Sequence, residues 1–164
     1  MSTERCQLRL FSETDKQHVK RLYKSEQVRK FLGGTVDDET FEKGFDSMMH
    51  SRNRSSYWTV FLKESQDFIG IVFLDTYHDG VKTEVGYQFL PEFWGRGYAR
   101  EVVTHVIEYG FSELNLDEIV AETQTRNTSS CRLLQKVGMT CVGQLERFGE
   151  EQSMFQLCRV GKVQ

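Results

Sequence analysis

The order of apolar and polar residues along the chain predicts alternating strands and helices. Apolar residues at every second position are typical of a half-buried strand, and spacings of three and four are typical of an amphipathic helix. Helices are expected after Ser12, after Asp37, and over 99–114 and 128–137. Strands are expected at 5–10, 57–63, 68–74, 83–90, 117–123, 139–145 and 154–160.

The clearest helix follows the strand at 83–90. Ala99, Val103, Ile107 and Phe111 form one row along it. A further strand at 117–123 completes a strand–helix–strand unit, which predicts a right-handed crossover between parallel neighbours. The helix that follows should end in a Schellman motif at Gly138 and Met139.

The three strands before this crossover are separated by short turns and predict an antiparallel meander. Asp79-Gly80 marks its second reversal, and Gly70 suggests a bulge in its middle strand. A final hairpin is expected to turn at 148–151. We therefore predict an α+β fold with a mixed, mostly antiparallel sheet and helices on both faces, formed by one domain over residues 1–164.

Composition narrows the possible functions. A net charge of −3 argues against a nucleic-acid groove as the main surface. No apolar run is long enough to cross a bilayer, and Met1–Arg5 has no apolar signal core, so a cytoplasmic location without membrane contact is expected. The four cysteines lack CxxC spacing and the four histidines are far apart, so no metal site is expected.

A glycine turn, Trp94-Gly95-Arg96-Gly97-Tyr98-Ala99, joins the strand at 83–90 to the clearest helix. Glycine allows positive φ and close approach, and the first N–H groups of a helix are free to bind an anion. No Lys-Ser or Lys-Thr pair follows Gly97, and Arg100 occupies the third glycine position of a dinucleotide fingerprint. Two interpretations of the turn remain. It is either a phosphate-binding site of another type or only a tight turn at the start of a helix.

This turn resembles the acetyl-CoA pyrophosphate motif of the GNAT superfamily of N-acetyltransferases, usually Gln/Arg-x-x-Gly-x-Gly/Ala. It matches at Gly97 and Ala99 and departs at Trp94. Four further blocks, in order along the chain, resemble the branch that contains the ribosomal-protein N-terminal acetyltransferases. They are Thr3-Glu4-Arg5-Cys6-Gln7-Leu8-Arg9, Glu84-Val85-Gly86-Tyr87, Asn127-Thr128-Ser129-Ser130 and Lys136-Val137-Gly138-Met139.

The resemblance implies a sheet splayed at its middle, between the strands at 83–90 and 117–123, with acetyl-CoA in the gap. The pantetheine arm would pair with the backbone of Gln88, Phe89 and Leu90, much as an added strand does. The pyrophosphate would lie on the turn. The cofactor-binding residues implied are Gln88, Phe89, Leu90, Gly95, Arg96, Gly97, Tyr98, Ala99, Arg100, Asn127 and Ser130. For the two arginines the alternative is a solvated cation, and for Asn127 and Ser130 an ordinary helix start.

The activity implied is direct transfer of acetyl from CoA to a primary amine, which is either a protein N-terminus or a small molecule. Glu84 is the expected general base, although a solvent-facing strand residue is the alternative. Leu134 stands where many family members carry a tyrosine that protonates the thiolate, so Ser130 is expected to stabilise that thiolate. A backbone N–H near Phe89 or Leu90 is the expected oxyanion donor.

Two other functions remain open at this stage. One is a non-catalytic acetyl-CoA-binding module, and the other is a nucleotide-phosphate binder that uses the same turn. The loops expected to select the acceptor are 33–38, 52–56 and 77–82. The resemblance implies a monomer or a homodimer.

Overall fold

The computed structural model describes residues 1–51 and 55–161, so 52–54 of the expected acceptor loop at 52–56 lie outside the described residues. Short 3₁₀ turns, η1 (Glu13–Asp15) and η2 (Pro91–Phe93), precede α1 and α4. The helices are α1 (Lys16–Tyr23), α2 (Glu26–Arg29), α3 (Asp38–His50), α4 (Tyr98–Ser112) and α5 (Thr128–Lys136). The strands are β1 (Cys6–Leu10), β2 (Ser56–Leu62), β3 (Phe68–Thr76), β4 (Thr83–Phe89), β5 (Glu118–Gln124), β6 (Thr140–Arg147) and β7 (Glu150–Cys158).

The strands of the described residues form one seven-stranded sheet in the order β1-β2-β3-β4-β5-β7-β6. Strands β2, β3 and β4 are the expected antiparallel meander, and α4 links β4 to its parallel neighbour β5. The other pairings are antiparallel. The mixed, mostly antiparallel sheet predicted from the sequence is confirmed.

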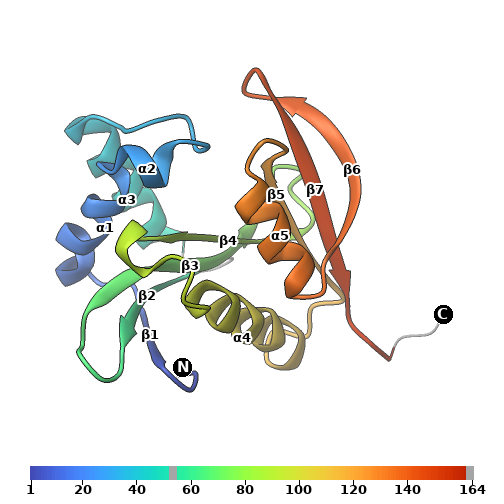
Figure 1. Ribbon diagram of the computed structural model, residues 1–164, viewed down its shortest axis with the longest axis horizontal. Helices are drawn as coiled ribbons and strands as arrows, with labels where there is room; N and C mark the ends of the chain where they lie inside the picture. Colours follow the sequence, from blue (N-terminus) through green and yellow to red (C-terminus); the bar gives the residue numbers. More distant parts are fainter. Residues whose placement is uncertain (52–54, 162–164) are drawn as a thin grey trace.

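The sheet is splayed between β4 and β5. Within the described part of the chain these strands share one register pair, Glu84 with Val120. By contrast, β3 and β4 pair continuously from Gly70–Phe89 to Thr76–Thr83. In Figure 1, β4 runs across the molecule whereas β7, beyond β5, rises steeply. The two halves therefore part on the side of Glu84 that leads to the glycine turn.

Helices cover both faces, and each face has its own buried cluster. On one face, Leu22 of α1 and Phe41 and Phe45 of α3 pack with Ile71 of β3. On the other, α4 and α5 pack on the sheet through a cluster that includes Val103, Val106, Leu134, Val85 and Phe155. Figure 1 shows α1–α3 grouped together and α4 and α5 around the opposite part of the sheet. This arrangement leaves the gap between β4 and β5 flanked by both groups of helices.

Strand β3 has a bulge close to the end of β4. Val60 pairs with Gly70 but Phe61 pairs with Phe68, so Ile69 is the extra residue, next to the glycine where a bulge was expected. A Cβ on Gly70 would lie 2.3 Å from the Gln88 carbonyl oxygen, so the close approach of β3 to β4 requires glycine.

Helix ends follow the expected local rules. Asp37 caps α3 by accepting the Thr40 N–H at 2.7 Å. The end of α5 is the predicted Schellman motif, since Gly138 has φ 96° and the Met139 N–H donates to the Leu134 carbonyl at 3.0 Å. No helix of the described residues combines the length and apolar content needed to span a bilayer.

The last hairpin differs most from the expectation. Strand β7 begins at Glu150 and not at 154, so the predicted turn over 148–151 was too long. Phe148 and Gly149 have φ of 57° and 73°, and positive φ at both central residues is the mark of a two-residue type I′ turn. Strand β6 is mostly exposed, so its residues show little alternation between buried and exposed positions. For this reason the apolar pattern did not predict that β7, its partner, begins at Glu150.

Candidate active site

The glycine turn lies between η2 and α4, at the open end of the gap. Gly95 and Gly97 have φ of 74° and 83°, which is the left-handed region that favours glycine. The first backbone bond of α4 runs from the Glu101 N–H to the Gly97 carbonyl at 3.1 Å. The N–H groups of Tyr98, Ala99 and Arg100 precede that bond and have no partner within the helix. The turn therefore has the geometry of an anion-binding site, and we call residues 95–100 the anion seat.

Two cations flank this seat. Arg96 and Arg100 are exposed, on either side of Gly97. The Arg96 guanidinium lies 5.9 Å from the centre of the Phe93 ring. Both side chains can therefore reach a phosphate in solvent, but neither is held in a buried ion pair.

The end of β4 is more fully bonded than the sequence suggested. The Leu90 N–H donates to the Ile69 carbonyl at 2.8 Å, and the indole N–H of Trp94 donates to the Phe89 carbonyl at 2.7 Å. Backbone groups alternate in direction along a strand, so those of Gln88, like the Leu90 N–H, face β3. The groups that face the gap belong to Tyr87 and Phe89.

The backbone of Gln88 and the Leu90 N–H are therefore engaged with β3, and the Leu90 carbonyl accepts the Phe93 N–H at 3.0 Å, whereas the Phe89 N–H faces the gap. The cofactor contacts expected for these three residues remain a prediction. The structure gives Trp94, which departs from the family motif, a role at the end of β4. Its indole N–H donates to the Phe89 carbonyl and so fixes the direction in which the chain leaves the strand.

Ser130 meets β4 across the gap. Its hydroxyl lies 2.7 Å from the hydroxyl of Tyr87. Asn127 caps α5 and accepts the Ser130 N–H at 3.2 Å, so it positions the serine. Burial raises the pKa of Tyr87 to about 12, while the hydrogen bond with Ser130 acts in the opposite direction.

Tyr87 was missed as a site residue, although it stands in the quoted Glu84–Tyr87 block. Residues two apart share a face of a strand, so Tyr87 lies with Val85 and Phe89 toward α4 and α5. That alternation was visible in the sequence. The partner on α5 was not, because the two residues are 43 positions apart.

Glu84 lies on the opposite face of β4, beside the point where β4 and β5 part. It is half-buried, and its pKa is raised from 4.5 to about 7. Burial is the main cause and the charge of Glu122 is the second, whereas the Glu122 backbone N–H and Arg147 act in the opposite direction. A carboxylate with a pKa near neutrality can accept a proton at physiological pH.

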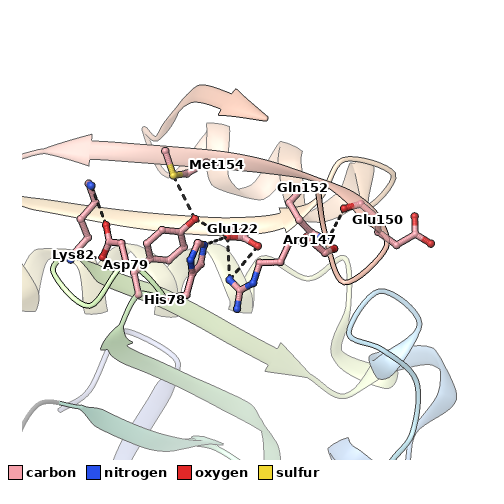
Figure 2. Close-up of polar contacts among 9 residues, drawn as sticks. His78, Asp79, Lys82, Glu122, Arg147, Glu150, Gln152 and Met154 are labelled. Atoms are coloured by element: carbon pink, nitrogen blue, oxygen red, sulfur yellow. Dashed lines mark hydrogen bonds and ion pairs between the residues drawn. The ribbon is translucent and has the colours of Figure 1, made fainter. Parts of the chain in front are cut away.

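The carboxylates near Glu84 accept hydrogen bonds from surrounding side chains. Glu122, whose side chain is 6% exposed, accepts the Tyr77 hydroxyl at 2.6 Å and lies 3.1 Å from His78 Nε2 and 3.4 Å from Arg147 Nη1. Figure 2 shows Glu122 between His78 and Arg147. The network joins β5 to the β3–β4 turn and to β6.

Asp75, opposite Glu84 on β3, accepts the hydroxyls of Ser55 and Tyr57. Glu122 and Asp75 therefore act as structural acceptors, and the nearby carboxylate of Glu84 has its pKa raised to about 7. Among the described residues, no group of three metal-ligating side chains is present.

A splayed sheet with an anion seat at its mouth defines the class of acetyltransferases that the sequence resembled. Comparison with known proteins confirms this. The model of the acetyltransferase (GNAT) domain family matches residues 5–140. The chain therefore belongs to the GNAT acetyltransferase family and is an N-acetyltransferase of that type.

Relatives agree with this assignment. The uncharacterized N-acetyltransferase YnaD of Bacillus subtilis is 31% identical over 139 residues, which cover 85% of this chain and 81% of YnaD. A GNAT-family acetyltransferase from Bacillus anthracis has a TM-score of 0.83 at 23% identity, over 96% of this chain and 97% of that one. Spermidine N-acetyltransferase from Vibrio cholerae, in complex with CoA and spermine, has a TM-score of 0.81 at 20% identity, over 94% and 95% of the two chains.

Proposed function

We propose that this enzyme transfers the acetyl group of acetyl-CoA to a primary amine by direct attack, with Glu84 as the general base. The observation that carries the proposal is the position of Glu84. It is a half-buried carboxylate with a pKa near 7, at the place where β4 and β5 part and on the strand that leads into the anion seat.

The residues present fit acetyl-CoA. The N–H groups of Tyr98, Ala99 and Arg100, which have no partner within α4, and the exposed Arg96 and Arg100 suit a pyrophosphate on the turn from Gly95 to Ala99. The backbone of Tyr87 faces the gap, where an amide of a pantetheine arm would find a partner. Asn127 and Ser130 border the gap from α5. Acetyl-CoA supplies the acyl group as a thioester.

The side chains provide the proton transfers that this reaction needs. An alkylammonium has no lone pair, so Glu84 takes one proton from it and the amine nitrogen can form its bond to the acyl carbon. The Phe89 N–H is placed to stabilise charge on the acyl oxygen. As the carbon–sulfur bond breaks, the nitrogen would lose its second proton to solvent, and the hydroxyl pair of Tyr87 and Ser130 would donate a hydrogen bond to the leaving thiolate.

The acceptor is a protein N-terminus or a small amine. Asp75 and Glu84 make this side of the gap acidic, since the charge of Glu122 is paired with Arg147, and this favours a cationic molecule. The Vibrio cholerae neighbour is described as a spermidine acetyltransferase and is bound to spermine, which makes polyamines a reasonable part of the test. The four free cysteines, Cys6, Cys131, Cys141 and Cys158, suit the reducing cytoplasm that we propose as the location of this enzyme.

Release of free CoA thiol tests the activity. The purified protein is mixed with acetyl-CoA and, in turn, with N-terminal peptides, polyamines and aminoglycosides. A thiol reagent should report turnover with at least one acceptor, and mass spectrometry should find the acetylated amine. Tight CoA binding without thiol release from any acceptor would instead indicate a non-catalytic binding module.

Replacement of Tyr87 by Phe should lower kcat about 5-fold to 20-fold and leave the CoA affinity nearly unchanged. The expected loss is modest because a thiol with a pKa near 8.5 leaves without a strong acid. Steady-state kinetics with saturating acceptor measures it. Tyr109→Phe is the matched control, since Tyr109 of α4 packs edge-on against Trp58 of β2. Equal rates for Y87F and wild type would remove Tyr87 from the mechanism.

A further inference from the structure

The N-terminal Thr3–Arg9 block, which the sequence marked as a family feature, is fastened to the start of α4. Glu101, in the first turn of α4, accepts the Thr3 hydroxyl at 2.5 Å and the Arg5 backbone N–H at 2.8 Å through Oε1. Its Oε2 accepts Arg5 Nε at 2.7 Å. Both oxygens of this carboxylate are therefore used to hold the segment before β1.

The guanidinium of Arg5 continues from Glu101 into the glycine turn. Arg5 Nη1 donates to the backbone carbonyl of Arg96 at 3.0 Å, and the guanidinium lies 4.3 Å from the centre of the Tyr98 ring. Arg5 Nη2 would be 3.3 Å from a Cβ on Gly97. One side chain thus contacts residues on both sides of Gly97 as well as the helix that follows.

This contact sets the direction of a peptide unit in the anion seat. The carbonyl of Arg96 and the N–H of Gly97 belong to the same planar trans peptide and point in opposite directions. Because Arg5 holds the carbonyl on its own side, the Gly97 N–H is turned away from Arg5. A carbonyl that rotated into the seat would place a partial negative charge where a phosphate has to bind.

Charge gives a second reason for the contact. Glu101 places a carboxylate, 19% exposed, one turn inside the helix N-terminus that would receive a phosphate. Two anions at one helix start repel each other. The ion pair with Arg5 neutralises the carboxylate, so the field of the turn stays favourable to an anion.

We propose that Arg5 is a positioning residue for the CoA pyrophosphate: it turns the Arg96 carbonyl away from the seat and neutralises Glu101. The proposal rests on the function proposed above, because it presumes that the seat receives CoA. It assigns a role to the Thr3–Arg9 block, which lies far from the glycine turn in the sequence. Arginine is required because one planar group must donate in two directions at once.

The test measures CoA affinity by calorimetry and the kinetic constants for acetyl-CoA. Arg5→Ala and Arg5→Lys should each weaken CoA binding about 10-fold, the size expected for losing one charge-assisted contact, and kcat should change less than about 2-fold. Arg9→Ala is the matched control, since Arg9 lies over Phe61 and donates to Gln66, away from the turn. Its CoA affinity should equal that of the wild type.

A truncated donor, S-acetylpantetheine, separates positioning from general damage because it lacks the pyrophosphate. The ratio of kcat/KM for acetyl-CoA to that for the truncated donor should fall about 10-fold in R5A. A proportional loss with both donors would overturn the proposal, as would wild-type CoA affinity in R5A. Retained affinity in R5K alone would also overturn it, since Arg5 would then act as a simple cation.

A double variant tests the charge argument. Glu101→Gln keeps an oxygen acceptor for Thr3 and removes the carboxylate charge. Added to R5A, it should recover part of the lost CoA affinity, and no recovery would refute the neutralising role.

If the wild-type protein itself bound no CoA, the proposed function would fall together with this proposal. If the wild type binds CoA and R5A is unaffected, only the role of Arg5 falls.

Discussion

Replacing Glu84 by Gln is expected to lower kcat/KM by about 100-fold to 1000-fold at pH 7, the usual contribution of a general base. The wild-type kcat/KM should rise tenfold per pH unit below about 7 and level off above it, because Glu84 must be ionised to accept the proton. In E84Q this limb of the profile should disappear. Rates across pH 5.5–9 in the thiol-release assay measure both effects.

The matched control is Glu64→Gln, an exposed glutamate in the β2–β3 turn. It should leave the rate and the pH profile unchanged. If E84Q kept the wild-type rate and the same titration, the base would be another group or solvent.

The same pKa shift has a consequence for stability that does not depend on activity. The pKa of Glu84 rises from 4.5 in the unfolded chain to about 7 in the folded one, so between these values the folded state binds more protons and stability falls as pH rises. The penalty at pH 8 is at most about 3 kcal/mol, and less because Glu84 is partly exposed to water. The stability of E84Q relative to wild type, from urea denaturation, should therefore increase from pH 4.5 to pH 8.

Replacing Gly97 by Val is expected to weaken CoA binding about 100-fold. Gly97 has φ 83° at the residue before α4, a conformation that is poor for any side chain and worst for a β-branched one. The Cβ would also come within 3.3 Å of Arg5 Nη2, so the turn would have to change shape. The N–H groups of the seat would then no longer converge on one anion. Calorimetric titration with CoA measures the loss.

Gly149→Val separates backbone strain from loss of the seat. Gly149 has φ 73° in the β6–β7 turn, and a Cβ there meets nothing within 4 Å. Both variants should lose a similar amount of stability, about 1–2 kcal/mol for the left-handed residue. Only Gly97→Val should lose CoA affinity. Wild-type CoA affinity in Gly97→Val would mean that CoA binds elsewhere.

The order of the elements could be predicted because each depends on local pattern. The alternation at 83–90 and the apolar row from Ala99 to Phe111 require only neighbouring residues to be interpreted. Asp37, Gly138 and Met139 form caps within a few residues. The start of β7 was misplaced because its partner β6 is mostly exposed and gives little pattern to follow.

The contacts of the site depended on chain crossings that no local pattern records. Tyr87 and Ser130 meet across the gap although they are 43 positions apart in the sequence. The raised pKa of Glu84 comes from burial and from Glu122 on β5. Neither the burial of Glu84 nor its closeness to Glu122 can be known without knowing which strands are neighbours and how far apart they lie.

The amino-acid sequence alone determined the family, the strand and helix order, and the position of the glycine turn, because these follow from residue types at short spacing. Tertiary structure alone decided which backbone groups at the end of β4 face the gap, which carboxylate titrates near neutral pH, and that Arg5 reaches the turn 91 residues away in sequence. Direction, burial and long-range charge are properties of packed neighbours, and a linear pattern contains none of them.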